Sequence, residues 1–174
     1  MNTRTVRTRF VLVLALLVFA TFAATSSAFA CVVGTGTSAS CTEAALDACL
    51  PGGGSFDGTV TFACGGAATI TVTTSPSKTI SADTTIDGGS LITISGDNAV
   101  GVFLVDGGVT FTAENLTIAN GNALNGGNII GGAIENNGGT VTVSNSIFSG
   151  NSAAIGSTGG GAIFQPRWHR ERDR

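Results

Sequence analysis

Gly131-Gly132-Ala133-Ile134 is followed by Phe148-Ser149-Gly150-Asn151 and then by Gly160-Gly161-Ala162-Ile163, so one tetrapeptide returns after about 30 residues. The same spacing lays residues 110–115, which read TFTAEN, over residues 140–145, which read TVTVSN. Self-similarity at a fixed period of this size is typical of a solenoid, in which each repeat is one supersecondary unit stacked on the next. We therefore expect stacked coils.

Each repeat contains a strand that ends in a corner. Val141 and Val143 alternate with threonines, which puts apolar side chains on one face and hydroxyls on the other. The alternation breaks at Asn115 and at Asn145 and then resumes. We expect these asparagines to occupy equivalent corners, because Asn tolerates a left-handed backbone and its amide can bond the neighbouring coils.

Short alternating runs also fill the chain ahead of this repeat. Turn sequences such as Asp87-Gly88-Gly89 and Asp106-Gly107-Gly108 separate them at intervals of roughly ten residues. The runs cover residues 60–64, 68–72, 80–86, 91–94 and 100–105. An antiparallel sandwich has similar spacing, but a sandwich does not require a repeat, whereas a stack of coils does. The sequence therefore predicts an all-β solenoid of roughly four to six coils.

The N-terminus has the pattern of a secretory signal peptide. Three arginines precede an apolar run over residues 10–20, and Ala28-Phe29-Ala30 offers a small-x-small cleavage site before Cys31. A membrane anchor needs roughly 18 or more apolar residues, and this run is shorter. A lipoprotein, in which Cys31 is acylated, is the alternative, but such a signal usually has a larger aliphatic residue at the position of Ala28. We assign residues 1–30 to a signal peptide and expect an exported protein.

Residues 31–164 form a strongly acidic body. They hold nine acids against the single basic residue Lys78, a net charge of −8 that the arginines at both ends of the chain reduce to −3. Such a surface repels nucleic acid and anionic lipid, so we expect neither as a partner. No second long apolar run follows the signal peptide, and we expect no membrane span in this body.

The four cysteines lie early in the exported part, which suits disulfides in an oxidising compartment. They are Cys31, Cys41, Cys49 and Cys64. A metal site is the competing interpretation, but the body has no histidine and no close CxxC pair. We therefore expect two disulfides and no metal.

A short helix lies among these cysteines. Ser40-Cys41-Thr42-Glu43 has the pattern of a capping box, and Pro51 ends the apolar run that follows. On that helix Cys41 and Cys49 would lie roughly 12 Å apart at ~1.5 Å per residue, too far to bond each other. We favour Cys31–Cys41 with Cys49–Cys64, and keep Cys31–Cys49 with Cys41–Cys64 as the alternative. We expect residues 31–57 to cap the first coil, because an open solenoid end exposes core and strand edges.

Several parts of the chain resemble bacterial right-handed parallel β-helix surface proteins. These parts are the cap sequence over residues 41–50, the strands over residues 60–70, the segment 84–89 and the two kinds of tetrapeptide. The named group is the polymorphic outer membrane protein repeat family, whose short signatures are GGAI and FxxN. The second signature occurs only once here, because residues 118–121 read IANG in the earlier coil. The signature positions are Gly131, Gly132, Ala133, Ile134, Phe148, Asn151, Gly160, Gly161, Ala162 and Ile163.

This resemblance covers residues 41–164 and implies a right-handed β-helix over residues 58–164 that serves as an exported passenger in adhesion, with no defined catalytic residue. Such proteins usually continue through many more coils to an outer-membrane barrel or a sorting segment. Here residues 165–174 instead hold four arginines and the only Trp and His of the chain. We expect an incomplete fragment with an aberrant basic tail; the alternative is a genuine basic recognition segment.

Enzymatic hypotheses face a limited set of side chains. Glycoside hydrolysis needs two carboxylates about 5–10 Å apart across one bond. Asp83, Asp87, Asp97 and Asp106 supply carboxylates, but the last three lie beside Gly or Asn in turn sequences, where aspartate bonds local amides. Lyase chemistry needs a base and usually a cation, and the body offers one lysine and no Arg, His or Tyr. The Asp-Gly turns allow weak calcium binding at most.

We therefore expect a non-catalytic, secreted or cell-surface β-helix protein without a cofactor, an adhesin or passenger module of the cell surface or outer membrane. The expected partner is an extracellular glycan or a component of a host or neighbouring cell surface. Aromatic platforms for sugars are scarce, and Phe62 falls on the apolar parity of its strand, which favours a core position. The alternative is the N-terminal part of a carbohydrate-active β-helix enzyme whose site lies outside these residues.

Overall fold

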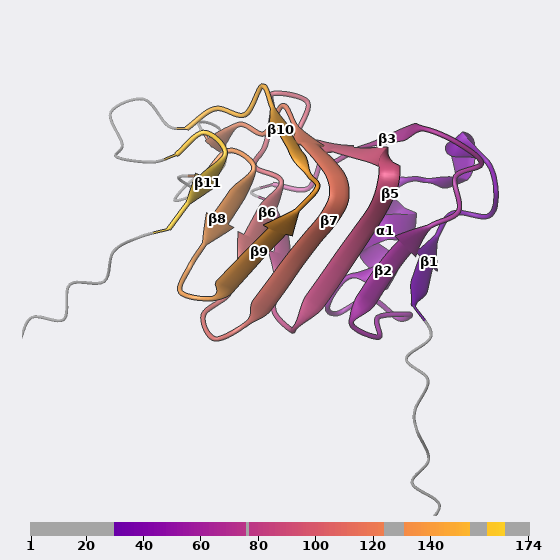
Figure 1. Cartoon of the computed structure of the whole chain (residues 1–174), viewed down its shortest axis with the longest axis horizontal. Coiled ribbons are helices and arrows are strands. Elements are labelled where there is room, and N and C mark those ends of the chain that lie inside the picture. The colour runs from indigo at the N-terminus through magenta and orange to yellow at the C-terminus, as the bar shows by residue number, and fades with distance from the viewer. Residues whose placement is uncertain (1–29, 76, 124–130, 154–159, 166–174) are drawn as a thin grey trace, which may run out of the picture.

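The computed structural model describes residues 30–75, 77–123, 131–153 and 160–165, and it forms a parallel β-solenoid of about four turns (Figure 1). One sheet contains β1, β2, β5, β7 and β10 in that order, with β3 paired to β5 and β9 paired to β7. A second sheet has the order β4-β6-β8-β11. All these pairings are parallel, as a stack of coils requires. The all-β solenoid predicted from the repeat is confirmed.

The strands are short, and one short α-helix precedes the coils. The cap contains β1 (Cys31–Val33), the 3-10 helix η1 (Ser38–Ser40) and α1 (Glu43–Cys49). The coils contain β2 (Thr59–Phe62), β3 (Ala68–Thr71), β4 (Lys78–Ile80), β5 (Thr84–Ser95), β6 (Phe103–Val105), β7 (Thr110–Ala119), β8 (Ile134–Asn136), β9 (Thr140–Ser144), β10 (Ile147–Ser149) and β11 (Ile163–Phe164). We number the coils by their strands: coil 1 is β2 to β4, coil 2 is β5 and β6, coil 3 is β7 and β8, and coil 4 is β9 to β11.

The strand register stacks like side chains in columns through the core. Ile70 of β3 lies beside Ile94, which lies beside Ile118, and Phe148 continues the column in coil 4. The first three are fully buried, and Phe148 packs half-buried against them. Hydrophobic burial and the main-chain ladder therefore stabilise the same arrangement, because a one-residue slip would turn every inward side chain outward.

The corners explain why the alternation of side chains breaks where it does. Asn115 and Asn145 have φ angles of 50° and 47°, in the left-handed region that Asn tolerates better than most residues. The register places them together, since Glu114 and Ser144 pair immediately before them. Asn115 also donates from Nδ2 to Asp87 Oδ1 of coil 2 at 2.9 Å. The corner side chain thus contributes a hydrogen bond between coils.

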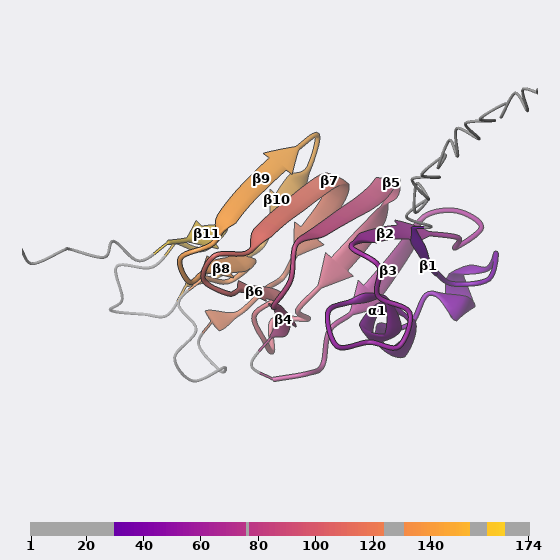
Figure 2. The same cartoon turned by 90° about the horizontal axis from the view of Figure 1, so that it is seen from below.

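The capping helix begins two residues later than the expected capping box. Thr42 is the N-cap, and its Oγ1 accepts a hydrogen bond from the N–H of Ala45 at 3.2 Å. Ser40 lies in η1, where its hydroxyl bonds the backbone of Thr35 and Thr37. Glu43 is then the first residue of α1 and does not close a capping box. Its side chain instead bonds Thr73, Thr74 and Lys78, which lie outside the helix. The helix covers the end of the stack beside β1 and β2 (Figure 2).

The cysteines are all paired, but the favoured connectivity was wrong. The disulfides are Cys31–Cys49 and Cys41–Cys64, with Cα–Cα distances of 5.4 and 5.7 Å. β1 pairs in parallel with β2, and its first residue, Cys31, lies beside the last residue of α1, Cys49. One disulfide therefore joins the end of the helix to β1, and the other joins Cys41, two residues before the helix, to Cys64 in the loop between β2 and β3 of coil 1.

The GGAI signature has a packing explanation. A Cβ on Gly132 would lie 2.5 Å from the Ser152 oxygen and 2.6 Å from the Gly161 oxygen, so coil 4 lies directly against this glycine. A Cβ on Gly131 or on Gly160 would meet the carbonyl oxygen of the isoleucine three residues later, at 2.3 and 2.2 Å. The two GGAI copies therefore form tight turns of the same kind, one in coil 3 and one in coil 4.

The asparagine of FxxN joins the last two coils. Asn151 donates from Nδ2 to the Ile118 oxygen at 2.9 Å and accepts at Oδ1 from the Gly121 N–H at 2.8 Å. Ile134 and Ile163 of the two GGAI copies pair directly in the second sheet. Both signatures therefore encode contacts between coils.

The proposed signal peptide, except for Ala30, and the tail after Gln165 lie outside the described residues. Within the described ranges, no helix is long and apolar enough to cross a membrane. The two disulfides are compatible with an extracellular location.

Gly132→Ala is expected to lower the free energy of unfolding by about 1–3 kcal/mol, because the new methyl group meets main-chain oxygens that cannot rotate away. Urea unfolding followed by circular dichroism measures this loss. Gly66→Ala is the matched control, since a Cβ there has open space within 4 Å. Equal stability of both variants would show that coil 4 does not pack on Gly132 as described.

Candidate functional site

A buried lysine stands at the head of an apolar column. In the second sheet Lys78 pairs with Phe103, which pairs with Ile134, which pairs with Ile163. The Lys78 side chain is only 5% exposed. A cation in this position requires compensation, because an unpaired buried charge costs several kcal/mol.

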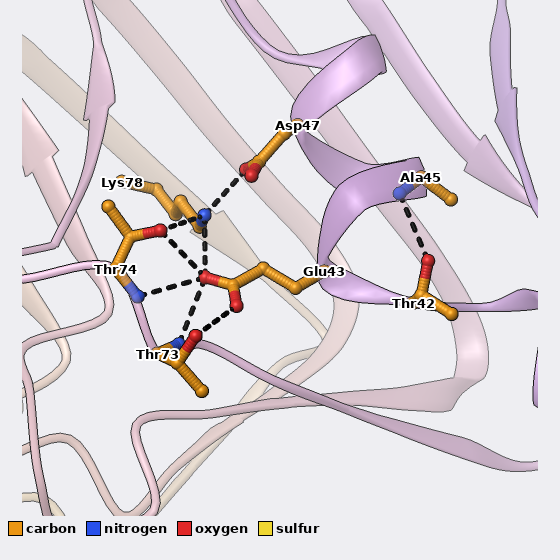
Figure 3. A network of polar contacts seen from close by, with 7 residues as sticks. All are labelled: Thr42, Glu43, Ala45, Asp47, Thr73, Thr74 and Lys78. Atoms are coloured by element: carbon orange, nitrogen blue, oxygen red, sulfur yellow. Dashed lines mark hydrogen bonds and ion pairs between the residues drawn. The ribbon is translucent and has the colours of Figure 1, made fainter.

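The cap helix supplies that compensation (Figure 3). Lys78 Nζ lies 2.7 Å from Glu43 Oε1 and 2.6 Å from Asp47 Oδ1, and it donates to Thr74 Oγ1 at 2.8 Å. Glu43 and Asp47 are one helical turn apart on α1, so both carboxylates face the same point. The three donors of the ammonium group are thus satisfied, and the cap is held on coil 1 by charge.

Glu43 is the centre of this network. Its Oε1 accepts the N–H groups of Thr73 and Thr74 at 2.9 and 3.0 Å, and the Thr73 hydroxyl donates to Oε2. Burial opposes ionisation of Glu43, but the bonds from Lys78, Thr73 and Thr74 outweigh it and hold the pKa of Glu43 well below its usual range. This role of Glu43 was not predicted from the sequence. The available signal was the single basic residue of the body, two residues before the inward Ile80.

A groove lies at the first corner of coils 1 and 2. Coil 3 turns this corner with Asn115 alone, whereas coil 2 inserts residues 88–91 between the paired Asp87 and Ile92. Coil 1 likewise uses residues 63–67 between β2 and β3. In stacked repeats such insertions form loops on one face, often the binding face. We therefore consider this corner the candidate binding site and call it the corner groove.

The corner groove has about 250 Å³ of space and a mixed lining. Leu91 is 55% exposed, and Phe62 is half-buried, so the expected core position of Phe62 is only partly realised: its ring packs against the core and also lines the groove. The remaining lining residues are Thr61, Ala63, Cys64, Gly65, Gly66, Asp87, Gly88, Gly89 and Ile92. The lining thus combines apolar side chains, glycines and one carboxylate.

Asp87 is the charged group of the corner groove. Its Oδ1 accepts from Asn115 Nδ2 and from the Gly89 N–H, each at 2.9 Å. These hydrogen bonds, first that from Asn115 and then that from Gly89, lower the pKa of Asp87 against slight burial. Its other oxygen, Oδ2, has no hydrogen bond to the described residues. An ionised acceptor held by two hydrogen bonds therefore lines the groove.

Two further aspartates bond the backbone of neighbouring strands. Asp57 Oδ1 accepts from the N–H groups of Cys31 and Thr59 at 3.2 and 3.1 Å. Asp83 Oδ1 accepts from the Thr110 N–H of the next coil at 2.8 Å. Asp97 lies at a left-handed turn with φ of 51°. Across the described ranges, no three His, Cys, Asp or Glu side chains are grouped to hold a metal ion.

The residues singled out from sequence do not converge on one site. The four cysteines lie in the cap and coil 1, whereas the GGAI and FxxN residues lie in coils 3 and 4, at the other end of the stack. Cys64 and Asp87 line the corner groove, and Asn115 reaches it through its hydrogen bond to Asp87. The cysteines and signatures thus hold the scaffold, and Asp87 lies where a ligand can reach it.

No family model, curated protein or solved structure shows significant similarity to this chain. The likeness to the polymorphic outer membrane protein repeat family therefore has no support beyond the tetrapeptides, and the fold assignment rests on the strand pairing itself.

Lys78→Met is expected to lower the free energy of unfolding by about 2 kcal/mol, less than the ~3–5 kcal/mol of a fully buried pair because Asp47 is half exposed. Chemical unfolding measures the loss. Thr79→Met, at the exposed neighbouring position, is the control. In a double-mutant cycle, Glu43→Gln and Lys78→Met should be non-additive; additive losses would contradict direct pairing.

The same network predicts a pH dependence. Because the folded pKa of Glu43 is lowered, its contribution is fully present above the unfolded value of about 4.3 and is lost as the pH falls through the folded pKa. The free energy of unfolding should therefore decrease as the pH falls below about 4.3. Glu43→Gln should flatten this decrease, whereas Glu114→Gln on β7 should not; identical profiles for the two variants would disprove the assignment.

Proposed function

We propose that this protein is an exported, non-catalytic β-solenoid module that binds neutral extracellular glycans at the corner groove, as part of a surface passenger or adhesin. The corner groove is the observation that carries the proposal. It lies where coils 1 and 2 abandon the repeat that coils 3 and 4 keep, and it combines apolar walls with a fixed carboxylate.

The lining suits a sugar ring. Ligand sites are mostly apolar with a few well-placed polar groups, and sugars present a C–H face together with hydroxyl donors. Leu91 and Phe62 offer apolar contact to such a face, and Asp87 Oδ2 can accept from a hydroxyl. A groove of about 250 Å³ suits one sugar residue, so the module would recognise a chain end or a branch.

Charge limits the choice of glycan. The body from residue 31 to 164 carries nine acids and one lysine, and that lysine is paired with Glu43 and Asp47. Uronate-rich or sulfated chains would be repelled by this surface. A neutral glycan avoids the repulsion, and the proposal therefore commits to that class.

Binding is favoured over cleavage by the position of the carboxylates. Among the residues that line the corner groove Asp87 is the one acid, whereas glycoside hydrolysis uses two. Asp57, Asp83 and Glu43 bond the scaffold. The alternative, the N-terminal part of a carbohydrate-active enzyme, would require a site formed by other residues.

The test is a glycan array and a pull-down with insoluble neutral polysaccharides, using the disulfide-bonded chain from Cys31 to Arg174. We expect retention of neutral glycans, and a loss of at least tenfold in affinity for Leu91→Ser and for Asp87→Asn. Leu91→Ser removes an exposed wall residue and should leave stability unchanged. Asp106→Asn is the matched control for the charge change, because Asp106 lies outside the groove.

Two outcomes would overturn the proposal. One is equal glycan retention by the parent protein and Leu91→Ser, which would place binding elsewhere. The other is release of shorter sugars from the polysaccharide, with turnover abolished by aspartate substitutions; this would establish the enzyme instead.

A further inference from the structure

The predicted cleavage site before Cys31 lies where the fold begins. The small-x-small sequence Ala28-Phe29-Ala30 predicts hydrolysis of the bond between Ala30 and Cys31. Cys31 is the first residue of β1 and is buried, with 8% of its surface exposed. The described residues therefore show what surrounds the nitrogen that this cleavage would release.

Asp57 receives the nitrogen of Cys31. Its Oδ1 accepts from the N–H groups of Cys31 and Thr59 at 3.2 and 3.1 Å, and its Oδ2 has no hydrogen bond to the described residues. Cys31 is held in this position from two sides, because its Sγ bonds Cys49 and its main chain pairs beside Val60 of β2. The carboxylate therefore lies next to a nitrogen that cannot easily move away.

A second aspartate shows what the same position does inside the stack. Thr59 pairs with Thr85, so Asp57 and Asp83, each two residues earlier, occupy equivalent positions of coils 1 and 2. Asp83 Oδ1 accepts from the N–H of Thr110 in coil 3 at 2.8 Å, where the chain is continuous and the donor is an ordinary amide. The donor on Asp57 instead belongs to the residue that cleavage would turn into a chain end.

Cleavage would change the charge of that donor. Hydrolysis adds water across the peptide bond and leaves a carboxylate on Ala30 and an α-ammonium group on Cys31, which is protonated at neutral pH. The one side-chain cation of residues 31–164, Lys78, is already paired with the cap helix. The new ammonium group is therefore a cation that lies within reach of Asp57.

We propose that Asp57 is the docking site of the processed N-terminus: cleavage after Ala30 converts the Cys31 amide into an α-ammonium group, which pairs with Asp57 and fastens β1 beside the start of β2. This ion pair forms only in an exported and processed chain, and so it rests on the proposed function. The Cys31 sulfur is bonded to Cys49 and is not free for acylation, so the processed end is a protein end and not a lipid anchor.

The first measurement is the N-terminal sequence and intact mass of the protein that a secreting bacterial host exports from the full chain of residues 1–174. We expect the exported protein to begin at Cys31 with an unmodified α-amino group. A different first residue, a lipid on Cys31 or an uncut chain overturns the inference. Absence of export overturns it together with the exported state, whereas glycan binding by the corner groove is measured separately on the chain from Cys31 and fails or holds independently.

The charge is tested by acetylating the processed protein, whose amino groups are the α-amino group of Cys31 and that of Lys78. Lys78 is 5% exposed and ion-paired, so mild acetylation near neutral pH modifies Cys31, and mass spectrometry of peptides verifies the position. The acetylated form keeps an amide N–H at Cys31, as the uncut chain does, but loses the positive charge. We expect acetylation to lower the folded-to-unfolded ratio about two- to fivefold in urea unfolding, as for the loss of an exposed ion pair.

Asp57→Asn and its control identify the acceptor. In Asp57→Asn the free and acetylated forms should be equally stable, because the side chain keeps an oxygen acceptor but carries no charge. In the matched control Asp83→Asn, whose aspartate receives an amide in both forms, acetylation should keep its full effect. A parent protein insensitive to acetylation overturns the proposal, as does an effect that persists in Asp57→Asn. If Asp57→Asn does not fold, salt decides: the effect in the parent should shrink at high salt, and an effect independent of salt overturns the ion pair.

Discussion

Every inner strand of a parallel stack needs a neighbour on both sides, and this constraint accounts for most of the molecule. The buried columns, such as Ile70, Ile94 and Ile118, exist because the main-chain ladder fixes the register from coil to coil. A ladder of this kind has no natural ending, since each added coil creates a new edge. The structure therefore has to be explained chiefly at its two ends and at its corners.

The first end is closed by chemistry that differs from the core. A short helix of seven residues has little stability of its own. It is held by two disulfides and by the ion pairs of Lys78, which join it to β1, to coil 1 and to the loop of Thr73 and Thr74. The acidic character of the body is thus partly structural: Glu43, Asp57, Asp83 and Asp87 each accept hydrogen bonds that connect separate segments.

The repeat could be predicted from the sequence, whereas the contacts formed outside the repeat could not. Alternating residues such as those around Val141 predicted parallel strands, and the break at Asn115 located the corner, because both patterns are local. The favoured disulfide connectivity was wrong and the alternative is the one observed, because the choice depends on how β1 and α1 pack, which spacing alone does not show. The capping box failed because Thr42 and Ser40 both fit an N-cap, and the partners of Glu43 lie about 30 residues away. The corner groove arises where the repeat is interrupted, so periodicity gave no sign of it.

The position of Lys78 has one more consequence. Its neighbours in the column are Phe103, Ile134 and Ile163, so at this position the register of β4 against β6 depends on the ion pairs as well as on the burial of Ile80 beside Val105. A slip of one residue would move the ammonium group away from both carboxylates and bring the Thr79 hydroxyl into the apolar column. The ion pairs of Lys78 therefore help to fix the register of β4 against β6. Each later coil is aligned by its pairing with the coil before it.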